Sequence, residues 1–242
     1  MIALYKKEIS LFFSSLTGYL VVGFFVVTSG LFLWVLPGQF NLLQGGYSTL
    51  EPFFALAPWI YLFLVPAITM RFIAEERRNG TLEILLTQPI SELELIVAKF
   101  LSGVTLVALS LLPVIFYYYS VYQLGNPIGN IDVGATWGSF IGLLLLTVVY
   151  VAIGLFSSSL TDNQVVAFVV SIALSFLFYN GIAQIGDMPL FDSGQQIFEF
   201  MSIDSHYSAL SRGVVDVRDV IYFISLTSLF LYFSKLNLKI GR

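Results

Sequence analysis

Cysteine is absent from the sequence, and charged residues and histidine are scarce in it. Without cysteine, the chain forms no disulfide bonds and offers no thiolate to a metal ion. Charged residues make up 11% of the 242 residues, whereas a soluble domain carries about 25%. The formal net charge of -4 is small and the sequence contains no basic run, so the charge pattern indicates no nucleic-acid partner.

The motifs of several enzyme classes are missing as well. The sequence contains no G-x-x-x-x-G-K-[ST] segment for nucleotide phosphates, no H-E-x-x-H motif and no G-x-S-x-G motif. We interpret the single histidine, His206, as a hydrogen-bonding residue at the membrane interface, because a lone histidine without companion ligands rarely binds a metal. We therefore predict a protein that is not an enzyme and binds no metal or cofactor of its own.

Hydrophobic residues, by contrast, make up 57% of the chain, more than a soluble fold of this length can bury. A helix needs about 20 mostly apolar residues to cross the hydrocarbon core of a membrane. The sequence predicts an all-α integral membrane protein with six transmembrane helices. The expected spans are roughly residues 17–36, 58–74, 96–122, 136–160, 164–185 and 219–236. The residues from Gln39 to Ala57 are expected to form an external loop, because a Pro-Gly pair and a polar run end the first span.

The positions of Lys and Arg predict the orientation. If the N-terminus is cytoplasmic, nine of these eleven residues lie on that side, and only Arg212 and Arg218 lie outside. This asymmetry agrees with the positive-inside rule, and an even number of spans returns the C-terminus to the cytoplasm. The sequence therefore predicts a multi-pass protein of the inner membrane with both ends inside. Arg71 and Lys99 are expected near the cytoplasmic ends of their spans.

Residues 1–16 are predicted to form an amphipathic helix at the cytoplasmic membrane surface. Apolar residues such as Tyr5, Ile9 and Phe12 recur at helical spacing, opposite Lys6 and Lys7. The alternative is a polar lead-in to the first span. The hydrophobic periodicity favours the interfacial helix.

Residues 75–95 are predicted to form a cytosolic segment with a short helix between two breaks. Asn79-Gly80 can end one helix in the left-handed conformation, and Thr81 can cap the next, which Pro89 must end. Ser91 with Glu94 forms a capping box for the third span. The short helix would carry three leucines on one face, namely Leu82, Leu85 and Leu86. That face needs a cover, which either a partner protein or the membrane surface could supply.

This segment resembles the cytosolic signature of ABC-exporter permeases of the second type, and the likeness extends over the whole chain. The residues that carry it are Glu75, Glu76, Asn79, Gly80, Thr81, Leu82, Glu83, Leu85, Leu86 and Pro89. The resemblance implies that the short helix is a coupling helix, which docks onto a separate ABC ATPase subunit that holds ATP and Mg. It also implies either a second permease copy or a second membrane subunit with a large external domain. In its length and in the absence of a fused domain, the chain most resembles the permease subunits of gliding-motility transporters.

Residues 186–218 are predicted to form an external re-entrant segment, because apolar residues alternate there with acids and serines. Part of this region resembles the outer segment of the same permeases, and the residues concerned are His206, Arg212, Gly213, Asp216, Arg218 and Asp219. At the start of the fourth span, Gly134, Gly138 and Gly142 recur at a spacing that lets helices approach closely. We favour packing within the chain over a subunit interface for these glycines.

Three functions are compatible with this pattern. The preferred one is the permease subunit of an ATP-driven exporter, which would couple ATP hydrolysis in its partner to transport or conformational work, with gliding motility as the expected process. A secondary transporter or channel would need no ATPase, and a copurifying ATPase would exclude it. A non-transporting membrane scaffold would pass ATPase movement to external proteins, and export from reconstituted vesicles would exclude it.

Overall fold

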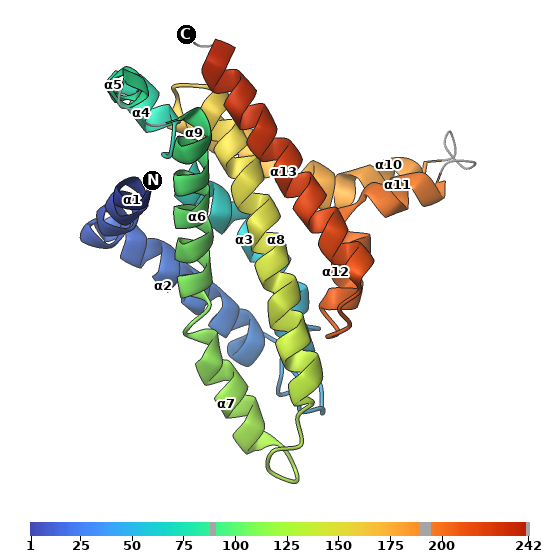
Figure 1. The fold of residues 1–242 in the computed structure, drawn as a ribbon. Coiled ribbons are helices and arrows are strands. Elements are labelled where there is room, and N and C mark those ends of the chain that lie inside the picture. The colour runs from blue at the N-terminus through green and yellow to red at the C-terminus, as the bar shows by residue number, and fades with distance from the viewer. Residues whose placement is uncertain (88–90, 189–194, 241–242) are drawn as a thin grey trace.

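The computed structural model describes residues 1–87, 91–188 and 195–240, and every regular element in these ranges is a helix (Figure 1). Six helical stretches are long and apolar enough to cross a membrane. They are Gly18–Val35, Glu51–Arg78, Glu92–Leu124, Val133–Leu160, Gln164–Gly186 and Val217–Lys239. The predicted all-α architecture with six spans is therefore confirmed.

Several spans are built from more than one element, and short helices lie between them. The first half of the chain contains α1 (Ile2–Ser14), α2 (Leu16–Gly30), the π-helical turn η1 (Leu31–Val35), α3 (Glu51–Thr69), α4 (Ala74–Arg78), α5 (Thr81–Thr87), α6 (Glu92–Ser110) and α7 (Val114–Leu124). The second half contains α8 (Val133–Leu160), α9 (Gln164–Phe176), the π-helical turn η2 (Leu177–Gly181), α10 (Ile182–Gly186), α11 (Gln195–Met201), α12 (Ile203–Leu210) and α13 (Val217–Ile240).

The second span begins earlier than the sequence predicted. The expectation that the loop extends to Ala57 is wrong, because α3 begins at Glu51 and Phe53, Phe54 and Ala57 are buried in the core. Pro52 lies in the first turn of α3, where a proline is tolerated because the amide it lacks would have no partner within the helix. Glu51 and Pro52, which we expected in the loop, therefore form the first turn of α3.

The fourth span, α8, lies at the centre of the bundle and packs against α3, α6, α9 and α13 (Figure 1). Small residues allow these close approaches. A Cβ atom placed on Gly154 would lie 2.0 Å from Oγ1 of Thr69 on α3, and one on Gly103 of α6 would lie 2.7 Å from the side chain of Val151 on α8. Close packing of this kind holds helices together in a membrane, where the lipid tails are as apolar as the side chains and the hydrophobic effect drives no association between helices.

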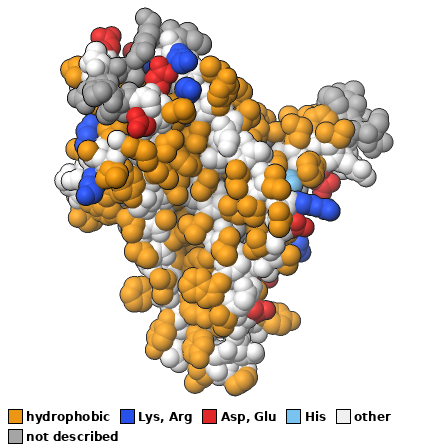
Figure 2. Space-filling view, in the orientation of Figure 1, with side chains coloured by type: hydrophobic (Ala, Val, Ile, Leu, Met, Phe, Trp, Pro, Cys, Tyr) orange, Lys and Arg blue, Asp and Glu red, His pale blue; other side chains and the backbone are white. Residues whose placement is uncertain are grey.

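The surface of the bundle is consistent with a membrane environment. Figure 2 shows hydrophobic side chains over most of the visible face, with charged side chains gathered toward the end that carries α1, α4 and α5 and around α12. Both ends of the chain lie at that first end of the bundle (Figure 1). This arrangement agrees with an even number of crossings.

The topology can be tested with reporter fusions. Reporters placed after residues 86 and 242 should give cytoplasmic signals, and a reporter after residue 195 should give an external one, because the Lys and Arg asymmetry orients the bundle. The measurement is paired alkaline phosphatase and green fluorescent protein activity in whole cells. An external signal at residue 86 would contradict the six-span orientation.

Candidate functional site

The segment between the second and third spans contains a sharp break between α4 and α5. Gly80 adopts the left-handed conformation with φ of 68°, and its amide donates to the carbonyl of Arg77 at 3.1 Å. A side chain at this position would strain the backbone, which explains the glycine. The Thr81 hydroxyl donates to the Glu76 carbonyl at 3.3 Å across the break. The predicted short helix is present as α5, which starts at Thr81.

The leucine face of α5 is turned toward the rest of the chain, whereas we expected it to be exposed. Leu82 is 7% exposed and belongs to the hydrophobic core, and Leu85 is half-buried against the same core. The side chain of Leu86 and the whole of Pro89 lie outside the described residues. The expectation of an exposed leucine face is therefore wrong for Leu82, because the face turns toward the rest of the chain. Among the described side chains of α5, Ile84 is the apolar one that faces outward, and it is 62% exposed.

A buried ion cluster fixes α4 against the bundle. Nζ of Lys99, whose side chain is 1% exposed on α6, lies 2.9 Å from Oε1 of Glu76 on α4 and 2.9 Å from Oε1 of Glu8 on α1. Lys7 lies 3.6 Å from the same oxygen of Glu76 but is half exposed. A buried ammonium needs partners because its desolvation is expensive. Lys99 therefore holds α1, α4 and α6 in one fixed arrangement.

A serine of the central helix holds the turn that leads into α4. The Ser158 hydroxyl accepts hydrogen bonds from the amides of Ile73 and Ala74 at 3.0 Å each, and it donates to the carbonyl of Met70 at 3.0 Å. The first amides of a helix have no partner within it. Ser158 therefore caps α4 from another helix and connects α4 to α8 directly.

The third span begins with the predicted capping box. The Ser91 hydroxyl accepts from the amide of Glu94 at 3.3 Å, and the Glu94 carboxylate accepts from the amide of Ser91 at 2.9 Å. The reciprocal pair satisfies two free amides at the start of α6. Because it lies immediately after the short helix, the box sets where the third span starts relative to α5.

The sequence pattern pointed to the α4–α5 segment but not to the contacts that hold it. Lys99 was expected as a cation near the end of its span, whereas the structure places it inside the protein between two acids. The only signal available was that Glu8, Glu76 and Lys99 are all expected at the same end of the bundle. Nothing local in the sequence indicates that residues 91 positions apart pair with each other.

Two of the predicted external residues, His206 and Asp219, come together where α12 meets α13. Nδ1 of His206 lies 2.7 Å from Oδ1 of Asp219 in the first turn of α13, and Nε2 lies 2.9 Å from the Phe200 carbonyl. The ring stacks on Tyr222 with centroids 4.0 Å apart. Both ring nitrogens of His206 are thus occupied by hydrogen bonds within the chain, which is a structural role.

The other predicted external residues shape the turn between α12 and α13. Gly213 has φ of 85° and packs against the backbone of Ala135 on α8. The carboxylate of Asp216 accepts from the amide of Arg218 at 2.9 Å. Nε of Arg212 donates to the Ser208 carbonyl at 3.1 Å. These contacts hold the turn in place and form no cluster with His206.

The glycines of the fourth span pack within the chain in two of three cases. A Cβ atom on Gly138 would lie 2.4 Å from the Gly213 carbonyl oxygen, and one on Gly142 would lie 2.6 Å from Cβ of Leu210. A Cβ atom on Gly134 would meet only its own neighbour Asp132, at 3.4 Å. The end of α12 therefore lies directly on α8 at Gly138 and Gly142.

No group of three or more potential metal-ligating side chains occurs within the described residues. The structure thus defines a multi-pass helical membrane protein with a short, anchored surface helix between its second and third spans. A comparison with protein families then identifies it more closely: the model of the ABC-2 family transporter proteins matches residues 3–234, and the chain belongs to that family. A comparison with curated proteins gave no match. Members of the family are membrane subunits that are not themselves catalytic.

The ion cluster can be tested by stability measurements. Lys99→Met removes the buried ammonium that Glu8 and Glu76 share and leaves Glu76 only the half-exposed Lys7, so it should lower the free energy of unfolding by about 3–5 kcal/mol. Lys7→Met removes a half-exposed partner and should change it by less than about 1 kcal/mol. The measurement is denaturant unfolding of the purified protein in mixed micelles.

A third variant separates charge burial from packing. Adding Glu8→Gln and Glu76→Gln to Lys99→Met removes the uncompensated charges, so most of the lost stability should return. If the triple variant is no more stable than Lys99→Met, the cluster acts through shape and not through charge.

Proposed function

We propose that this chain is the permease half of an ATP-driven exporter and that α4 and α5 receive the movement of a separate ATPase subunit. The observation that carries the proposal is that α4, which leads directly into the surface helix α5, is bonded to two other spans. Glu76 holds α4 to Lys99 of α6, and Ser158 holds the start of α4 to α8. A force applied to α5 is thereby transmitted into the bundle at several points.

The outer face of α5 is suited to docking. Glu83 and Ile84 are exposed there, while Leu82 fixes the helix to the core. A partner with an apolar pocket would cover Ile84, and such central apolar anchors dominate the binding energy of many interfaces. ATP and Mg would be held by this partner, because the chain lacks a phosphate-binding motif.

The finer assignments follow from resemblance. The chain resembles GldF, the permease subunit of gliding-motility transporters, and this resemblance favours a complex in the inner membrane with a second membrane subunit that carries a large external domain. Within this proposal, α1 lies at the cytoplasmic membrane surface and residues 186–218 lie at the external one. The same coupling segment would serve a scaffold that transmits movement without transport, and export from reconstituted vesicles separates these two functions.

Docking through α5 can be tested by a single charge on its outer face. Ile84→Asp should weaken binding of the copurifying ATPase by at least about tenfold, because the change removes an apolar anchor and adds a charge that must be desolvated. The measurement is ATPase binding to the permease in nanodiscs by surface plasmon resonance. Insertion and stability should be unaffected, because Ile84 is exposed.

The matched control places the same charge in the other cytoplasmic loop. Asn163 caps α9 through its side-chain oxygen, which accepts from the amide of Val165 at 2.9 Å, and an aspartate preserves such a cap. Asn163→Asp should therefore bind the ATPase as the unmodified chain does. If Ile84→Asp binds the ATPase as tightly as Asn163→Asp does, the result would contradict a docking role for α5.

A further inference from the structure

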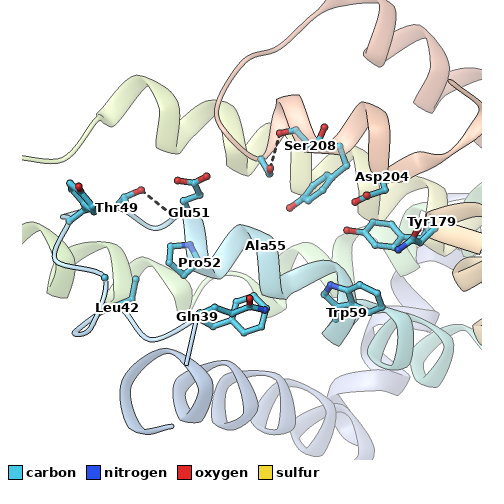
Figure 3. A pocket seen from close by; sticks show the side chains of 16 residues that line it. Gln39, Leu42, Thr49, Glu51, Pro52, Ala55, Trp59, Tyr179, Asp204 and Ser208 are labelled. Carbon is cyan, nitrogen blue, oxygen red and sulfur yellow. Dashed lines mark hydrogen bonds between the residues drawn. The ribbon is translucent and has the colours of Figure 1, made fainter. Parts of the chain in front are cut away.

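A pocket of about 570 Å³ opens at the other end of the bundle from α5. Its walls come from the loop after η1, the first turns of α3, the π-helical turn η2 and α12 (Figure 3). This volume lies in the range of small-molecule binding sites.

Two carboxylates line the pocket, and none of its lining residues carries a positive charge. Glu51 is the first residue of α3, and its amide donates to the Thr49 hydroxyl at 3.1 Å. Asp204 lies in the first turn of α12. In the part of the chain that the structure describes, neither carboxylate forms an ion pair. The pocket lining therefore carries two carboxylates and no cation, and the cation beside it is Arg212, which lines an adjoining hollow together with Glu51.

Aromatic side chains form much of the remaining wall. Trp59 and Tyr179 meet edge to face with ring centroids 5.6 Å apart, and Figure 3 shows Asp204 close beside Tyr179. Tyr47 and Phe40 line the side formed by the loop. Aromatic faces attract cations, most strongly those of tryptophan and tyrosine. Carboxylates beside aromatic rings are thus complementary to a cation that also has apolar surface.

The backbone around Tyr179 supplies a second, independent sign of a binding site. Tyr179 and Asn180 both belong to η2 and both line the pocket, and π-helical turns inside α-helices occur frequently at functional sites. The turn is held in place from α12, because the Ser202 hydroxyl donates to the Tyr179 carbonyl at 2.6 Å. This bond fixes the helix that carries Asp204 against the turn that carries Tyr179.

We propose that this pocket binds an organic ammonium ion, with Glu51 and Asp204 supplying the countercharge and Trp59 and Tyr179 supplying aromatic contact. A bare metal ion fits less well, because it requires several oxygen ligands around one point and the described residues contain no cluster of three potential ligands. The ammonium group could belong to a soluble amine or to a lipid headgroup. Binding at this site does not depend on the proposed coupling to an ATPase.

The test uses choline and its uncharged carbon isostere, 3,3-dimethylbutan-1-ol, as probes. The full chain is placed in nanodiscs of phosphatidylglycerol, which has no ammonium group, and binding is followed by isothermal titration calorimetry. Choline should bind, and the isostere at equal concentration should not compete with it. The affinity should fall as salt rises, because the attraction is electrostatic.

Two variants connect binding to the pocket. Asp204→Asn and Glu51→Gln keep the shape of each side chain and remove its charge. Asp204→Asn should weaken choline binding at least about tenfold, because Asp204 is partly buried. Glu51→Gln should weaken it less, because Glu51 is exposed and solvent screens its charge. Asp162→Asn removes one exposed carboxylate from the loop between α8 and α9 and should leave the affinity unchanged. Folding of each variant is checked by its thermal unfolding temperature.

The outcomes separate the possible ligands. If phosphatidylcholine in the nanodiscs raises the apparent Kd of soluble choline, the site takes a lipid headgroup; if it does not, the site takes a soluble amine, and both results support the proposal. Equal binding of the isostere, unchanged binding in the Glu51→Gln and Asp204→Asn double variant, or no choline binding up to tens of millimolar would each overturn it. Because no ATPase is present, these results are independent of the test on Ile84.

Discussion

The buried ammonium of Lys99 is the group on which the end of the bundle that carries α1, α4 and α5 depends. It holds one carboxylate from α1 and one from α4, each at 2.9 Å, so the positions of both helices relative to α6 are set by a single group. Exposed ion pairs break and form at little cost, but separating this cluster would leave a buried charge without a partner. The cluster therefore makes α1, α4 and α6 move together, and the bond from Ser158 extends this unit to α8.

The opposite end is held by a tyrosine hydrogen bond and by the pair of His206 with Asp219. The Tyr207 hydroxyl donates to the Phe54 carbonyl at 2.8 Å, and His206 connects α12 to α13 through Asp219. Burial raises the pKa of the Tyr207 hydroxyl well above its usual value, so this donor keeps its proton at physiological pH. These bonds fix α12, which carries Asp204 of the neighbouring pocket, on α3 and α13.

The parts of this structure that the sequence predicts are those with local causes. The spans follow from runs of apolar residues, the start of α6 from the Ser91–Glu94 capping box, and the break before α5 from Gly80, whose φ is positive. The parts that it does not predict depend on tertiary contacts. The spacing of Leu82 and Leu85 predicts a shared face but not that this face turns inward, and the third span contains no signal that Lys99 meets Glu8. The sequence does not predict the pocket for the same reason, since Glu51 and Asp204 are 153 positions apart and only the fold brings them into the wall of one pocket.

The second span joins the two ends. It begins at Glu51 in the pocket wall and leads through the turn held by Ser158 into α4. Thr69 lies against Gly154, and Phe72 lies against Gly103, with no space for an added Cβ atom at either glycine. The second span packs so closely on α6 and α8 that it moves together with them more readily than it slides past them. A short translation along either helix would cause a steric clash at Gly103 or at Gly154. A ligand bound at Glu51 and a force applied at α5 therefore act on the same tightly packed unit. By thermodynamic linkage, a ligand that binds more tightly to one position of this unit also stabilises that position. Movement of α5 must then change the affinity for the ligand by the same free energy that the ligand contributes to the movement.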